Sequence, residues 1–113
     1  MRFWKDGRVV LESDVVSGTM DGAHNTPQGL YYLLAKQQNA VLRGADYVQP
    51  VNYWMQFTYD GIGFHDATWR GSFGGDIYQW GGSHGCVNMT LDAAGPLYDL
   101  IDFSTPIITY YLD

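Results

Sequence analysis

Glycine divides this chain into short apolar runs, and that spacing constrains the fold more than any other feature. Fourteen glycines occur in 113 residues, and several follow a turn-forming residue, as in Asp6-Gly7, Ser17-Gly18 and Asp60-Gly61. The nine tyrosines and the valine pairs between such turns have high strand propensity. We therefore expect mostly β structure with tight turns, in one domain spanning residues 1–113.

The expected strands can be placed along the chain. They cover residues 9–11, 15–16, 30–34, 52–57, 62–65 and 107–112. The sequence Lys5-Asp6-Gly7-Arg8 predicts a hairpin turn, because Asp-Gly favours positive φ. Residues 35–50 show no period and are predicted to form a long excursion, and residues 66–82 a second loop rich in glycine and aromatic residues.

One segment has helical spacing. Apolar residues recur there at Leu91, Ala94, Leu97, Tyr98 and Ile101. Thr90 is a suitable N-cap. The pair Gly95-Pro96 opposes a regular helix, because proline lacks an N–H and crowds the preceding turn. We therefore predict one short helical segment that is kinked or broken.

Composition excludes several classes of protein. Twelve acidic and six basic residues give a net charge of −6, which argues against a nucleic-acid partner and gives no attraction to anionic membranes. No signal pattern opens the chain, and no apolar run reaches the roughly 20 residues that span a bilayer. The single cysteine, Cys86, cannot form an internal disulfide.

The chemistry-bearing residues gather around Cys86. It stands in Ser83-His84-Gly85-Cys86-Val87-Asn88, and His65 precedes Ser83 with 17 residues between them. A thiol attacks as the thiolate, and an imidazole can take its proton and later return it to a leaving amine. The pattern therefore predicts a cysteine nucleophile with a histidine base.

This order and spacing resemble the signature of L,D-transpeptidase catalytic domains, the YkuD-like family. The resemblance extends to Thr26-Pro27-Gln28-Gly29 and to the segment from Pro50 to Met55. It implies a YkuD-like β-sandwich of mixed strands. The family usually has a strand before the Phe3-Trp4 region, and we expect that strand to be absent or very short here.

The resemblance also implies roles for individual residues. Cys86 is expected to be the nucleophile and His65 the base, oriented by the backbone carbonyl of Asp66, whose side chain is a possible second acceptor. His84 is expected to support the thiol or the oxyanion, and Gly85 and Cys86 to supply oxyanion N–H groups. Ser83 and Asn88 complete the motif, with asparagine where many members have arginine.

The implied reaction is acyl transfer on peptidoglycan. Cys86 is expected to attack the bond before the terminal D-alanine of a stem tetrapeptide and form a thioester, which a neighbouring stem amine resolves into a 3→3 cross-link. Water as acceptor gives an L,D-carboxypeptidase instead. The resemblance implies peptidoglycan stem peptides as partners, carbapenems as inhibitors and an extracytoplasmic location. It requires no metal or cofactor, and a monomer is favoured.

Aromatic side chains are the candidates for a substrate groove. Tyr47, Trp54, Trp69 and Trp80 are predicted to contact substrate, although core packing is an alternative that is stronger for Trp54. Arg43 and Arg70 are interpreted as surface charges rather than carboxylate ligands. His24 lies in a polar turn and is given no role.

Other readings of the motif remain to be compared. A sortase-like enzyme needs an arginine after its cysteine and an NlpC-type peptidase a histidine, and neither residue follows Cys86. A zinc site formed by His65, His84 and Cys86 lacks the usual close ligand pairs. A non-catalytic wall-binding module on the same fold, or an inert buried thiol, is the remaining alternative.

Overall fold

The structure is a computed structural model that describes residues 1–44, 47–75 and 77–110. At its centre lies a five-stranded mixed sheet. Its strand order is β3-β8-β7-β6-β5. In this sheet, β7 and β8 pair in parallel, and the other neighbouring strands pair antiparallel. The bounds are β3 Val15–Val16, β5 Ala35–Arg43, β6 Val48–Gln56, β7 Gly63–Asp66 and β8 Val87–Met89. The expectation of mostly β structure with strands of mixed direction is confirmed.

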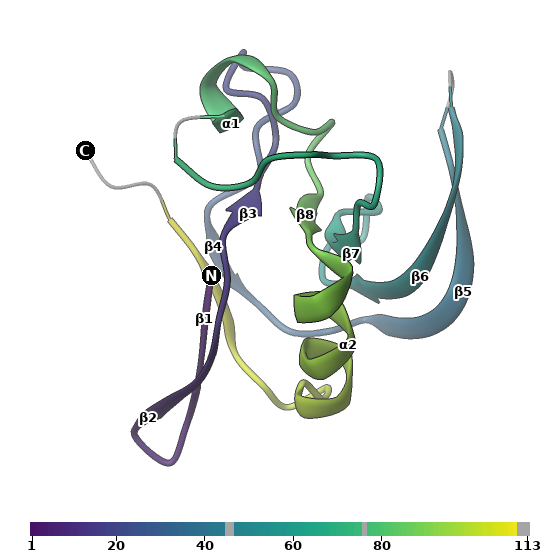
Figure 1. Cartoon of the computed structure of the whole chain (residues 1–113). Coiled ribbons are helices and arrows are strands. Elements are labelled where there is room, and N and C mark those ends of the chain that lie inside the picture. Colours follow the sequence, from purple (N-terminus) through teal and green to yellow (C-terminus); the bar gives the residue numbers. More distant parts are fainter. Residues whose placement is uncertain (45–46, 76, 111–113) are drawn as a thin grey trace.

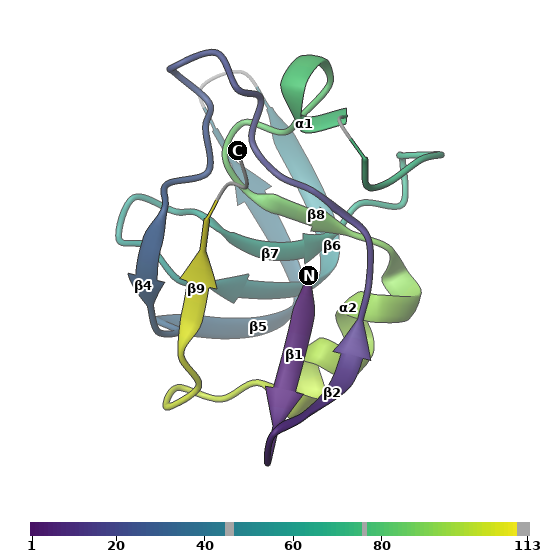
Figure 2. The ribbon, with the colours of Figure 1, turned by 90° about the vertical axis from the view of Figure 1, so that its left-hand side faces the viewer.

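Two antiparallel pairs form a second layer. They are β1 (Arg2–Lys5) with β2 (Arg8–Glu12), and β4 (Gly29–Tyr31) with β9 (Ile107–Thr109). Figure 2 shows both pairs in front of the central sheet. The turn between β1 and β2 is the predicted one, with Asp6 and Gly7 at φ values of 52° and 77°, as a two-residue hairpin requires.

The main core lies between the central sheet, the second layer and helix α2 (Leu91–Leu100). Figure 1 shows α2 beside β7 and β8, and it contacts β2, β6 and β7. Each fully buried apolar side chain of the main core stabilises the fold by roughly 1.5–3 kcal/mol. The largest of them in this core are Phe57, Met55, Met89 and Leu97.

Helix α2 runs through Pro96 without the predicted break. Thr90 caps its start as predicted, accepting a hydrogen bond from the Ala93 N–H at 3.2 Å. Pro96 removes the donor for the Asp92 carbonyl, and both residues are exposed, so water can take the free carbonyl. At the other end, Lys36 Nζ donates to the carbonyls of Tyr98 at 2.6 Å and Ile101 at 3.0 Å, which closes the helix.

The predicted excursion at residues 35–50 is wrong. Strands β5 and β6 form a long curved hairpin there (Figure 1), with one antiparallel register from Ala35 to Arg43 that skips Asn39, whose φ is 53°; residues 45–46 lie outside the described part. Strand β5 is largely exposed, and β6 buries only Val51, Trp54 and Met55, so no regular hydrophobic alternation marks the hairpin. Strand β7 pairs only with Trp54, Met55 and Gln56 of β6. Because β7 does not reach Pro50, the missing N–H of this proline breaks no hydrogen bond between β6 and β7.

Smaller differences concern element ends. The strand predicted at 30–34 is shorter, as β4, and the last strand is described as β9 with residues 111–112 of its predicted range outside the described part. A second helix, α1 (Ile77–Trp80), interrupts the predicted loop at 66–82, of which residue 76 is not described. Among the described residues, neither helix is long and apolar enough to cross a membrane.

Candidate active site

The parallel pairing of β7 with β8 brings the two halves of the motif together. Their register places His65 beside Asn88 and Phe64 beside Val87. Cys86 directly precedes β8 and packs against the cluster of Ala40, Val51 and Trp54, and the Trp54 ring lies 6.0 Å from that of His65. Residues 67–86, between the two strands, form the crossover that parallel strands require.

His65 is held in one orientation at the centre of this face. It is 5% exposed, and its Nδ1 lies 2.9 Å from the backbone carbonyl of Asp66, the acceptor that the family resemblance implied. The rings of Trp54 and Trp69 flank the imidazole with centroid distances of 6.0 and 5.9 Å. The carbonyl fixes the proton on Nδ1, so the lone pair of the imidazole lies on Nε2.

The Asp66 carboxylate has a different task from the one we expected. It accepts hydrogen bonds from the backbone N–H groups of Asn52 at 2.9 Å and Tyr53 at 2.8 Å, and from Asn52 Nδ2 at 3.0 Å. It is therefore not a second acceptor for the imidazole. Instead it holds β6 where the β6–β7 ladder ends, and Asp66 supports the site through its backbone carbonyl and through this anchor.

Replacing Asp66 with leucine is expected to lower the free energy of unfolding by about 3 kcal/mol or more. The substitution leaves two backbone N–H groups without their acceptor at a side chain that is 1% exposed. Asp66→Asn is the control, because one acceptor oxygen remains and the loss is expected to be smaller. Urea denaturation measures both; equal losses would contradict the proposed anchoring role.

Cys86 is half-buried beside the second, smaller core cluster of Ala40, Val51 and Trp54. Its Sγ lies 3.8 Å from the Gly61 carbonyl oxygen. Burial raises the pKa of the thiol, an effect that the Gly63 N–H opposes and the negative charge of Asp60 reinforces. Burial also lowers the pKa of His65. The resting pair is therefore a neutral thiol and a neutral imidazole.

The loop that presents Cys86 is tied down by hydroxyl groups. Ser83 Oγ donates to the Cys86 carbonyl and accepts from the Gly85 N–H at 3.1 Å. Thr26 Oγ1 donates to the Gly85 carbonyl at 2.5 Å and accepts from the Gly18 N–H at 2.8 Å. Since the Gly85 N–H is bound to Ser83, its predicted oxyanion role requires that bond to be exchanged when substrate enters.

Gly18 allows two chain segments to approach the catalytic loop. A Cβ at this position would stand 1.8 Å from the His24 carbonyl oxygen and 2.9 Å from Gly85 Cα. Gly18→Ala is therefore expected to displace the loop, lower stability by roughly 1–3 kcal/mol and slow acylation of Cys86. Gly71→Ala is the matched control, because a Cβ there meets nothing within 4 Å. Comparable loss in both variants, measured by urea denaturation and acylation rate, would contradict this prediction.

His84 belongs to a cluster that the sequence did not reveal. Its exposed ring lies 4.9 Å from that of His24 and edge-on to Tyr47 at 5.7 Å. His24 Nδ1 pairs with Asp21 Oδ2 at 2.7 Å, and this contact contributes most to lowering the pKa of Asp21 to about 2. His24 was given no role, because a histidine in a polar turn carries no local signal of a distant partner.

The tryptophans predicted to bind substrate separate into two groups. Trp69 and Trp80 are 50% and 72% exposed, whereas Trp54 is 8% exposed and packs against His65. Burial argues against direct substrate contact by Trp54, so it supports the imidazole instead. Tyr47, 42% exposed, stands with Trp69 and Trp80 as the candidates for ligand contact.

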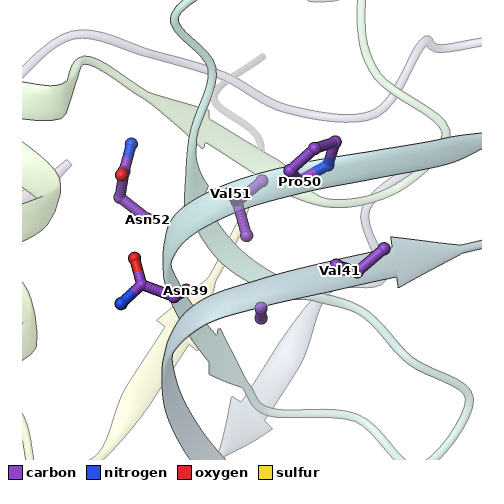
Figure 3. Close-up of a pocket in the computed structure, with 6 residues that line it drawn as sticks. Asn39, Val41, Pro50, Val51 and Asn52 are labelled. Atoms are coloured by element: carbon purple, nitrogen blue, oxygen red, sulfur yellow. The ribbon is translucent and has the colours of Figure 1, made fainter.

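Two shallow hollows lie near the site elements. One, of about 260 Å³, is lined by Arg70, Gly71, Ser72, Ile77, Trp80 and Gly81. The other, of about 210 Å³, lies on the β5–β6 hairpin between Asn39 and Pro50 (Figure 3). Asn52 lines this second hollow and is bound to Asp66. Neither hollow is lined by Cys86 or His65.

Asn88 occupies the remaining side of His65. It is 2% exposed. In the amide orientation that satisfies its neighbours, Nδ2 donates to His65 Nε2 at 3.1 Å and the side-chain oxygen accepts from Arg70. In the described part of the chain, no three His, Cys, Asp or Glu side chains converge as a metal site would require. The arrangement is suited to nucleophilic acyl transfer with a positioned base.

Residues 1–109 match the family model described as the L,D-transpeptidase catalytic domain, YkuD. The match covers nearly the whole chain. The chain therefore belongs to the L,D-transpeptidase catalytic domain family. A search of curated proteins finds no match.

Solved structures of L,D-transpeptidases are similar to this chain. The avibactam carbamoyl enzyme of Ldtfm has 37% identity and a TM-score of 0.92 over 100% of this chain and 45% of its own. The Enterococcus faecium catalytic domain acylated by ertapenem has 37% identity and a TM-score of 0.83, covering 97% and 88%. An enzyme from Mycobacterium tuberculosis has 26% identity and a TM-score of 0.77, covering 98% and 46%.

Proposed function

We propose that this chain is a cysteine acyltransferase that cross-links peptidoglycan stem peptides. The observation that carries the proposal is the β7–β8 register, which pairs His65 with Asn88, two residues after Cys86, while the Asp66 carbonyl fixes the imidazole. Family membership supports it. The chain spans less than half the length of Ldtfm, so the activity and substrates proposed are those of the catalytic domain.

The first half-reaction forms a thioester. His65 Nε2 gives up its hydrogen bond from Asn88 Nδ2 and takes the Cys86 proton, and Sγ attacks the carbonyl carbon between the third stem residue and D-alanine. Backbone N–H groups of the 83–86 loop stabilise the oxyanion. Collapse of the tetrahedral intermediate breaks the C–N bond, and the imidazolium returns its proton to the departing amine of D-alanine.

The second half-reaction restores the enzyme. An amine from a neighbouring stem attacks the thioester carbonyl while His65 accepts its proton. The C–S bond then breaks, a 3→3 amide remains in the product, and Cys86 recovers a proton from the imidazolium. Because both half-reactions pass one proton through the same Nε2 atom, one histidine is sufficient for the cycle.

The exposed rings around the site supply a surface for the stem. The rings of Tyr47 and His84 lie edge to face. The exposed rings of Trp69 and Trp80 belong to the crossover between β7 and β8. Peptidoglycan lies outside the cytoplasmic membrane, so this proposal places the domain in an extracytoplasmic compartment. Ring surfaces bind apolar stem atoms without fixing their sequence.

The test is incubation with synthetic tetrapeptide stems, followed by mass spectrometry of the products. D-Alanine release with a 3→3 dimer is the expected result. Tripeptide without dimer would show an L,D-carboxypeptidase, with water as acceptor. Stem binding without D-alanine release would overturn the enzymatic proposal in favour of a wall-binding module.

A further inference from the structure

Arg70 is not the free surface charge that its sequence context suggested. It is half-buried in the crossover between β7 and β8. Nη1 donates to the Gly81 carbonyl at 2.8 Å. Nε and Nη2 lie 2.9 and 3.2 Å from the Asn88 side-chain oxygen. The guanidinium fork therefore joins both ends of the crossover to a residue that touches the candidate base.

These contacts fix the direction of the Asn88 amide. A guanidinium only donates hydrogen bonds, so the Asn88 oxygen must face Arg70 and Nδ2 must face His65. Nδ2 lies 3.1 Å from His65 Nε2 and needs an acceptor there. With Nδ1–H bound to the Asp66 carbonyl, both ring nitrogens are assigned, and Nε2 carries no proton in the resting site.

We propose that Arg70 is a positioning residue that acts through Asn88 to keep His65 neutral with its proton on Nδ1. The inference rests on the proposed function, which assigns the base to His65. An imidazolium would direct Nε2–H against the Nδ2 hydrogens. Turning the amide to relieve that clash would set Nδ2 against the guanidinium, so the chain of contacts favours return of the proton from His65 to the leaving amine.

The charge of Arg70 must be separated from its geometry. Among the described residues, the ionisable groups that act on His65 are Asp66, which favours the imidazolium, and Arg70, which disfavours it; Asp60 acts on Cys86. Arg70→Lys keeps the positive charge and loses the planar fork, so it tests orientation alone. Arg43→Lys, at an exposed position on β5, is the matched control.

The primary measurement is the rate of iodoacetamide alkylation of Cys86 against pH, compared with D-alanine release from a tetrapeptide stem. In Arg70→Lys the amide is free to turn and His65 holds a proton more readily. Alkylation near neutral pH is expected to rise on the order of tenfold, about one pKa unit, while D-alanine release falls. A merely structural role would lower both rates, and that result would overturn the proposal.

A double-mutant comparison of Arg70 and Asn88 tests whether Arg70 changes the alkylation rate of Cys86 through Asn88. If Arg70 acts through Asn88, Arg70→Lys is expected to leave the alkylation rate unchanged in an Asn88→Leu background. An undiminished effect there would overturn the proposal. The ring ¹⁵N shifts of wild-type His65 give a test without any substitution, because an Nε2–H tautomer at neutral pH would contradict it directly.

Failure of the proposed function can be recognised separately. Alkylation and the ring ¹⁵N shifts need no peptide substrate. If wild type releases no D-alanine while both readouts respond as expected, the positioning role stands and the assigned reaction fails. If wild type cross-links stems while Arg70→Lys behaves like Arg43→Lys in every measurement, the function stands and the positioning role fails.

Discussion

Cys86→Ala is expected to abolish covalent capture of a carbapenem. The β-lactam carbonyl requires a nucleophile, and the alanine side chain has none. Intact-protein mass spectrometry is expected to show a one-to-one adduct on wild type and none on the variant. The E. faecium catalytic domain acylated by ertapenem, with which this chain shares 37% identity, makes a carbapenem the appropriate probe.

The control is wild-type protein unfolded in urea, which keeps the thiol but loses its surroundings. Slow or absent acylation of the unfolded chain would show that reactivity belongs to the assembled site. Rapid acylation of Cys86→Ala would remove Cys86 from the nucleophile role. Folded wild type without an adduct would indicate a disabled site and favour the wall-binding alternative.

His65→Ala is expected to slow acylation by about 10²–10⁴-fold, the usual contribution of a general acid–base group. Burial keeps the Cys86 thiol protonated near neutral pH, so without the imidazole no positioned group removes its proton. The rate of adduct formation in stopped-flow or quenched mass spectrometry measures the loss.

His24→Ala is the matched control for loss of an imidazole. His24 contacts His84 and Asp21 and has no place in the proposed proton path, so a far smaller effect is expected. Added imidazole is expected to restore part of the His65→Ala rate, because the vacated space adjoins Nδ2 of Asn88 and the Asp66 carbonyl. Equal rates for His65→Ala and wild type would exclude His65 as the base.

Local signals made part of the fold predictable. The Asp6-Gly7 turn, the Thr90 cap and the helical period from Leu91 each depend on residues close in sequence, and each is confirmed. The single domain over 1–113 stays a prediction. Family resemblance supplied the mixed sandwich, which composition alone did not specify.

The misjudged elements are those whose form depends on distant partners. The β5–β6 hairpin has no hydrophobic alternation, and Pro50 is tolerated only because β7 ends short of it. Helix α2 accommodates Pro96 because the Asp92 carbonyl faces water. Neither circumstance is visible in a window of neighbouring residues.

The site shows the same division. The motif named Cys86 and His65, and the resemblance named the Asp66 carbonyl, which the geometry matches. Arg70, His24 and Thr26 were missed, because their roles arise from contacts across the folded chain. The role predicted for the Asp66 carboxylate is wrong for a related reason. Its residue type suggested an acceptor for the imidazole, whereas it accepts from the backbone N–H groups of Asn52 and Tyr53 where the β6–β7 ladder ends.

The bond from Thr26 to the Gly85 carbonyl joins residues 59 positions apart. The surroundings of Cys86 thus depend on contacts that close late, since loops of this length lose much entropy when they form. In the folded chain, segment 17–26 is bound to the Cys86 loop through Thr26 and Gly18. Adduct formation on Cys86 should accordingly count correctly folded molecules in a refolding mixture, which makes the thiol an internal gauge of folding yield.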